Sequence, residues 1–372
     1  MKTELCERFG IEYPIFVFTP SEKVAAAVTR AGGLGMLGCV RFNQADDLER
    51  VLQWMDENTD GKPYGVDIVM PAKVPTEGTA VDIDKLIPQT HREFVDETLA
   101  DLGVPPLPDD EAKSEGVLGW LHSVARSHVE VALKHPIKLI ANALGTPPKD
   151  VIDQVHEAGV PVAALAGSAK HALRHLDIGV DIVIAQGHEA GGHTGEIASM
   201  VLVPEVVDAL DGKAAVLAAG GIGSGRQVAA ALALGAQGVW MGSAFLTAAE
   251  YDLGVRGSSG VSVIQEAMLA ATSSDTVRRR IYTGKPARLL KSRWTEAWDA
   301  DGAPEPLPMP LQNILVSEAH QRMNEAKDPT AVAMPVGQIV GRMNEIRPVA
   351  DIMAELVSGF DEATRRLDGM RG

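Results

Sequence analysis

Short apolar segments that alternate with amphipathic ones are the feature that most constrains the fold of this chain. The apolar segments are Tyr13–Phe18, Leu34–Cys39, Tyr64–Val69, Ile137–Ala141, Val160–Leu165, Asp181–Ala185, Ala214–Ala219 and Gly238–Met241. Segments that are apolar throughout are typical of strands buried on both faces, as in a parallel sheet. Amphipathic segments such as Ala45–Asn58 and Ser224–Leu234 lie between them. Eight strand–helix pairs predict an α/β fold, the (β/α)8 TIM barrel, rather than a doubly wound sheet.

Two regions fall outside this rhythm. The third strand–helix connection, about residues 71–119, is too long for an ordinary loop and contains an amphipathic piece at His91–Leu102. It predicts a helical insertion after strand 3 that lies over one face of the barrel. The rhythm stops after about residue 252, and an amphipathic helix is expected near Pro348–Leu367. The predicted domains are therefore a barrel, residues 1–252, and a C-terminal helical annex, residues 253–372, that covers the substrate.

Composition excludes several classes of protein. The formal net charge is −16, with Phe 7, Trp 5 and Tyr 4, so nucleic-acid binding is not expected. Two cysteines favour a reduced, cytoplasmic setting without a disulfide scaffold. The uncharged stretch 227–249 is interrupted by glycines and is interpreted as helix, buried strand and helix start, so no membrane span is expected.

Glycine-rich turns follow the seventh and eighth predicted strands. Residues 220–225 read Gly-Gly-Ile-Gly-Ser-Gly, and Gly242-Ser243 follows Met241. Glycine lets a ligand approach the backbone closely, and the free N–H groups of a helix start favour an anion. In TIM barrels a phosphate commonly binds after these two strands. The pair of turns predicts a phosphate site, with ordinary tight turns as the alternative.

The loop after the sixth strand, Gln186–Gly195, contains four glycines, two histidines and a glutamate. A zinc site is disfavoured, because Gly191-Gly192 would break the helix that aligns the ligands of an HExxH motif. One imidazole acting as an acid or base on the reactive face of the barrel is the preferred interpretation.

Two other patterns indicate a binding site only weakly. The letters of a dinucleotide fingerprint occur at Gly33, Gly35 and Gly38, but they precede a strand instead of following one, which favours close backbone packing. The basic residues of 278–293 fit either a solvated helix face or a site for an anionic substrate tail.

The motifs QGHEAGGHTG, LAAGGIGSG, GVWMGSAF and AGGLGMLG together resemble those of the FMN-dependent nitronate monooxygenase family, formerly called 2-nitropropane dioxygenase. Reductases of enoyl thioesters of the FabK type are relatives of that family. The resemblance covers roughly residues 5–250 and continues more faintly through TGKPAR and PVGQIVG. It implies a non-covalent FMN at the mouth of the barrel and oxidation of alkyl nitronates with O2 to carbonyl compounds and nitrite.

The resemblance also implies roles for particular residues. His193 matches the catalytic base. The flavin phosphate is expected at Gly220, Gly221, Gly242 and Ser243. Further cofactor-binding residues are expected at Asp67, Gly167, Ser168, Gln186, Gly191, Gly192 and Met241. Asp67 is a departure, because the family commonly has asparagine there.

Two other functions remain open at this stage. One is an FMN-dependent reductase or dehydrogenase of acyl or enoyl thioesters that uses NAD(P)H, with the basic residues of 278–293 holding a substrate phosphate. The other is a catalytically silent module that binds flavin or another metabolite. The annex could close over the flavin or form the interface of a homodimer.

Overall fold

The computed structural model describes residues 1–70, 86–107, 121–257 and 260–371 and contains a closed, parallel eight-stranded barrel. Its strands are β1 Ile15–Thr19, β2 Leu34–Gly38, β3 Tyr64–Ile68, β4 Ile140–Asn142, β5 Val162–Ala166, β6 Ile182–Gln186, β8 Ala215–Ala219 and β9 Gly238–Met241. Each strand pairs with the next in this order, and β9 closes on β1 with Ile15 opposite Val239. All eight predicted strands and the TIM-barrel fold are confirmed.

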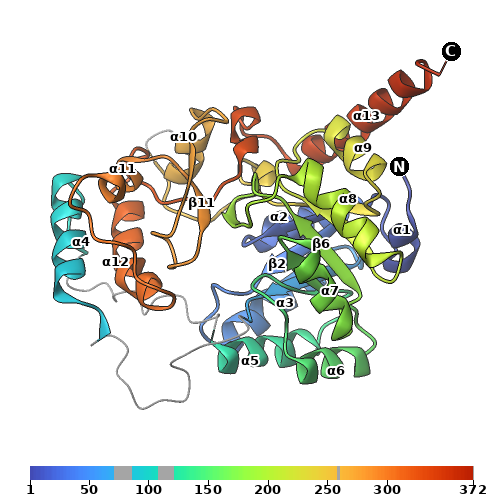
Figure 1. Ribbon diagram of the computed structural model, residues 1–372, viewed down its shortest axis with the longest axis horizontal. Coiled ribbons are helices and arrows are strands. Elements are labelled where there is room, and N and C mark those ends of the chain that lie inside the picture. The colour runs from blue at the N-terminus through green and yellow to red at the C-terminus, as the bar shows by residue number, and fades with distance from the viewer. Residues whose placement is uncertain (71–85, 108–120, 258–259, 372) are drawn as a thin grey trace.

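Helices surround the barrel and build a second group of elements beside it (Figure 1). Those before or around the barrel are α1 Glu4–Phe9, α2 Glu22–Arg30, α3 Ala45–Asn58, α5 His122–Ala132, α6 Lys149–Glu157, α7 Ala169–Asp177, α8 Ser199–Leu210 and α9 Gly225–Ala233. The insertion contributes α4 Gln89–Asp101, and the C-terminal part contributes α10 Val263–Leu269, α11 Arg293–Asp299, α12 Leu311–Glu325 and α13 Val349–Asp368. Short 3-10 helices are η2 Ser243–Phe245 and η3 Gln338–Arg342.

The two faces of each barrel strand pack into different layers of the core. Phe16, Met36 and Leu217 lie in one cluster inside the barrel, whereas Val17 and Val66 pack outward with residues of the helices. This follows from the alternation of side chains along a strand. The interior is therefore filled, and the carboxyl ends of the strands form the reactive mouth that this fold uses.

The glycines of the 33–38 segment allow close backbone packing, as predicted from the sequence. A Cβ built on Gly35 would lie 2.0 Å from the Ala25 carbonyl oxygen on α2, and one on Gly33 would lie 2.7 Å from the Ile15 carbonyl oxygen. Strand β2 and helix α2 can approach this closely only because Gly35 has no side chain.

Gly35→Ala is therefore expected to destabilise the protein by about 3 kcal/mol or more, because the added methyl group must displace backbone in a packed core. Thermal and urea denaturation measure the effect. Gly369→Ala is the control, since a Cβ there would be in ordinary contact, 3.6 Å from the Arg365 carbonyl oxygen. An unfolding midpoint for Gly35→Ala equal to that of the control would contradict the packing argument.

The described part of the insertion contains helix α4, which confirms the amphipathic helix predicted there. This helix packs on α12, and Ile87, Val95 and Leu99 share a core cluster with residues of the C-terminal region. Figure 1 shows α4 beside α12, away from the barrel helices. Residues 71–85 and 108–120 of the predicted insertion lie outside the described residues.

The expectation of a solvated helix face in 278–293 is wrong. Thr276–Arg279 and Ala287–Leu290 form an antiparallel hairpin, β10 and β11, and β11 pairs with the short strand β7, Gly192–His193. The Arg288 side chain is buried and donates to the His188 carbonyl oxygen at 2.9–3.0 Å. Arg-rich sequence shows no apolar period of 2, so only pairing with distant β7 reveals this sheet.

The last helix, α13, confirms the predicted amphipathic helix and packs against α9 and α2 on the outside of the barrel. It ends in a projecting turn in Figure 1. Gly225, at the start of α9, permits this contact, because a Cβ there would lie 2.2 Å from the Phe360 amide nitrogen. Among the helices of the described ranges, none is both long and apolar enough to cross a bilayer.

Candidate active site

Two glycine turns lie side by side at the mouth of the barrel. Gly220 and Gly221 follow β8, Gly242 and Ser243 follow β9, and these two strands are paired. Gly220 and Gly221 have φ of 107° and 67°, which favour glycine. The backbone N–H groups of these four residues donate to no acceptor within the described parts of the chain. Unused amides converging from two turns fit the terminal phosphate of a cofactor.

A C-terminal segment covers the turns. The Gly337 N–H donates to the Ser243 hydroxyl at 2.9 Å, and the Gln338 N–H donates to the Glu189 carbonyl oxygen at 2.9 Å. A Cβ on Gly191 would lie 2.7 Å from the Gly337 nitrogen. The loop after β6, the turn after β9 and residues 336–338 are thus locked together.

The carboxylate of Glu189 is held beside these turns by Ser199, whose hydroxyl also lies 3.0 Å from the Gly220 carbonyl oxygen. It accepts hydrogen bonds from the Ser199 hydroxyl at 2.7 Å and from the Ser199 N–H at 3.1 Å, at the start of α8. Its negative charge therefore lies where the helix dipole favours it. An anion at the glycine turns does not face an uncompensated carboxylate.

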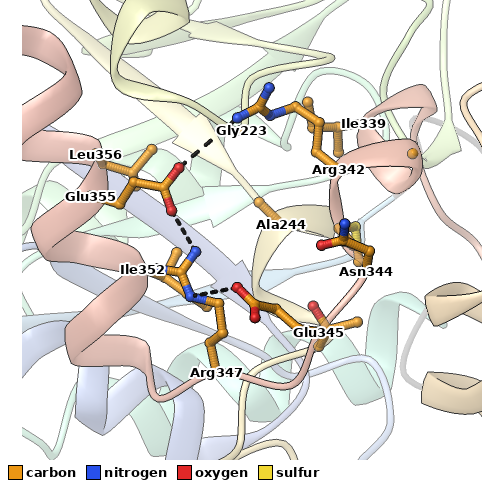
Figure 2. Close-up of a pocket in the computed structure, with 13 residues that line it drawn as sticks. Gly223, Ala244, Ile339, Arg342, Asn344, Glu345, Arg347, Ile352, Glu355 and Leu356 are labelled. Carbon is orange, nitrogen blue, oxygen red and sulfur yellow. Dashed lines mark hydrogen bonds and ion pairs between the residues drawn. The ribbon is translucent and has the colours of Figure 1, made fainter.

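A polar cavity of about 340 Å³ lies behind the same turns (Figure 2). Gly223 and Ala244, which continue the two turns, line one side, and the segment 341–347 with α13 lines the other. Figure 2 shows Glu355 between the guanidinium groups of Arg342 and Arg347, with which it forms ion pairs. Arg347 also pairs with Glu345 at 3.4 Å. The charges balance, so this network ties α13 to the segment over the turns.

His193 lies between the barrel and the hairpin. As part of β7 it is held opposite Ala287 of β11, and its Nε2 is 2.6 Å from the Thr283 hydroxyl oxygen. Burial, and next the positive charge of Lys285, lower the pKa of His193 from 6.5 to about 4. The imidazole is therefore neutral at neutral pH and can accept a proton.

Lys285→Gln is expected to raise the pKa of His193 from about 4, though not to 6.5, because burial is the larger cause. A base is active only when unprotonated, so kcat/KM for a substrate that loses a proton falls as pH drops through this pKa. The acid limb of the pH profile should thus move to higher pH in the variant. The exposed Lys291→Gln is the control, and an acid limb that stays in place in Lys285→Gln would contradict the assignment.

The other predicted cofactor residues differ in whether their side chains face the mouth of the barrel. Gln186 ends β6 at the mouth, and a Cβ on Gly167 would lie 3.2 Å from the Gly195 Cα, which brings the loops after β5 and β6 together. The Ser168 hydroxyl caps α7 by accepting from the His171 N–H at 3.3 Å. Met241 is the last residue of β9 and lies at the mouth, but its side chain packs outward in a helix-facing cluster, which leaves only its backbone for a contact with a cofactor.

Asp67 lies on β3, one residue before the strand ends, and is 2% exposed. Burial raises the pKa of its carboxyl well above the usual range. The carboxyl forms no hydrogen bond or ion pair with any residue in the described ranges.

Comparisons with known proteins agree with this arrangement. The profile of the nitronate monooxygenase family matches residues 2–359. This chain belongs to that family. A putative monooxygenase of Mycobacterium tuberculosis is 46% identical over 100% of this chain and 99% of its own length. A probable nitronate monooxygenase of Staphylococcus aureus is 26% identical over 97% of this chain and 98% of its own length.

The chain is also similar in structure to solved enzymes. Nitroalkane oxidase from Streptomyces ansochromogenes has a TM-score of 0.79 at 26% identity, covering 97% of this chain and 99% of that one. FabK from Thermotoga maritima has a TM-score of 0.75 at 27% identity, covering 100% of this chain and 99% of that one. The protein is therefore an enzyme, an oxidoreductase of the nitronate monooxygenase family.

Sequence reasoning missed two residues that contact predicted site residues. Thr283 contacts His193 across the hairpin, and Gly337 contacts the turn after β9. Both belong to motifs that carry the resemblance more faintly, TGKPAR and PVGQIVG. Their spacing of 90 and 94 residues from their partners gives no local signal.

Proposed function

We propose that this protein binds FMN at the barrel mouth and oxidises alkyl nitronates with O2 to carbonyl compounds and nitrite. The observation that carries the proposal is the set of unused amides at Gly220, Gly221, Gly242 and Ser243, in one barrel mouth with a neutral His193. FMN, when bound, supplies the electron transfer and the reaction with oxygen.

The residues of the chain supply binding, orientation and proton transfer. The four amides stabilise the phosphate without a lysine or arginine at the turns. His193, with its Nε2 held against the Thr283 hydroxyl, accepts the proton from the carbon of a neutral nitroalkane. The Lys285 ammonium lies close enough to lower the pKa of His193, and it attracts an anionic nitronate to the same place.

The proposal also assigns different functions to the two predicted domains. Residues 1–252 would hold the cofactor, and residues 253–372 would cover the substrate. The pairing of β7 with β11 and the contact of Thr283 with His193 support it, because both join the C-terminal part to the loop after β6.

The experiment is an assay of the purified, FMN-loaded protein with propyl nitronates under oxygen. Nitrite should form well above the rate given by free FMN at equal concentration. Nitrite production at the free-flavin rate would reject the proposed reaction.

A second candidate is an FMN-dependent reductase or dehydrogenase of acyl or enoyl thioesters that uses NAD(P)H. The TM-score of 0.75 to FabK from Thermotoga maritima favours it. NAD(P)H oxidation stimulated by an enoyl thioester, without nitrite from nitronates, would select this function over the first.

A further inference from the structure

Asp67 is a carboxyl group inside the barrel. Its neighbours on β3, Val66 and Ile68, pack outward among helix residues, so alternation turns Asp67 inward. Gly65 has the same parity, and a Cβ there would lie 2.6 Å from the sulfur of Met36, a residue of the interior cluster. Asp67 is the penultimate residue of its strand, and it therefore lies near the mouth.

Among the described residues, the surroundings of Asp67 provide no compensating charge. Its register partners on β2 and β4 are Gly38 and Ala141. The titratable groups nearby are the buried Cys39 thiol, whose pKa the Asp67 charge helps to raise, and Arg41, which is paired with Glu22 at 2.6 Å. A buried carboxyl without a partner is costly, and buried polar groups are nearly always hydrogen-bonded. Its hydrogen-bond partner is not among the described residues.

We propose that Asp67 is a carboxylic acid that donates a hydrogen bond to the cofactor bound at the mouth, and that its proton makes cofactor binding depend on pH. This inference rests on the proposed function, because it takes the bound group to be FMN. Burial, with no cation beside it among the described residues, raises the pKa of Asp67 and keeps the proton on it. An ionised carboxylate would offer no hydrogen to an acceptor atom and would bring an unpaired charge beside the ligand.

The test compares the wild type with Asp67→Asn, whose amide is similar in size, donates a hydrogen bond and does not titrate. FMN is titrated into each apoprotein between about pH 6 and pH 9, with flavin fluorescence and absorbance as the readouts. The wild-type affinity should fall relative to the variant as pH rises above the pKa of Asp67, by up to about tenfold for each pH unit. Asp208→Asn, at an exposed position on α8, is the control and should follow the wild type.

Stability of the apoproteins gives a readout independent of FMN. A carboxyl with a raised folded-state pKa contributes stability that is complete below its unfolded pKa of about 3.9 and is lost as pH rises through the folded-state pKa. As pH rises, the denaturation midpoint of the wild type should therefore fall relative to that of Asp67→Asn.

The two ways of failing are distinct. A wild-type protein that binds no FMN would overturn the proposed function and this inference with it. FMN binding with parallel pH profiles in the wild type and Asp67→Asn would overturn the role of Asp67 alone.

Discussion

His193→Ala is expected to lower turnover of a neutral nitroalkane by about 10²–10⁴-fold, the usual contribution of a positioned general base. Turnover of the matching nitronate should fall far less, because the nitronate has already lost its proton. The bound FMN should remain, since the imidazole contacts Thr283 and not the glycine turns. The measurement is kcat/KM with 2-nitropropane and with propyl-2-nitronate, together with the flavin content of the purified variant.

His171→Ala is the matched control, because His171 is an exposed histidine on α7 and should leave both substrates unaffected. An equal loss with nitroalkane and nitronate would mean that His193 does something other than remove a proton. Unchanged turnover of the nitroalkane would remove the assignment altogether.

Gly221→Asp is expected to weaken FMN binding by about two to three powers of ten. Like charges about 4 Å apart near a protein surface repel by about 4 kcal/mol, and the new carboxylate would lie at the turn proposed to hold the phosphate. A Cβ at Gly221 would also lie 3.2 Å from the Cβ of Glu189, so some adjustment of the loop is expected. Fluorescence titration of the apoprotein with FMN measures the loss.

Two further variants separate charge from backbone strain. Gly221→Asn has a similar shape without the charge, and asparagine tolerates a positive φ, so it should retain much of the affinity. Gly61→Asp introduces the same residue at a φ of 69° where a Cβ would meet nothing within 4 Å, and it should bind FMN like the wild type. Stoichiometric FMN in purified Gly221→Asp would refute this placement of the phosphate.

The barrel could be predicted because its signal is local. Each strand of a parallel barrel is buried on both faces, so its residues are apolar in succession whatever their partners, and the eight segments stand out. For the same reason, the sequence of a strand does not reveal which side chains point into the barrel and which point toward the helices. Met241 is predicted as a cofactor-binding residue, and its side chain packs outward. Hydropathy does not distinguish the barrel interior from the layer under the helices.

The hairpin of β10 and β11 could not be predicted from the sequence, because its stability comes from strand pairing and not from an apolar pattern. Arg288 reads as a surface residue, yet its guanidinium satisfies the His188 carbonyl at the core of the site. The partner strand, β7, has only two residues and lies nearly a hundred positions earlier. No window of sequence contains both.

The sequence by itself determined the barrel, the two glycine turns at its mouth and the histidine-bearing loop, because each depends on residues close together in the chain. The tertiary structure alone decided the partners of these residues. It placed Thr283 and Lys285 next to His193, set Gly337 on the turn after β9 and buried Asp67 with no counter-charge among the residues that the structure describes. Proton affinity depends on burial and on charges within a few ångströms, and in a folded chain those neighbours come from distant segments.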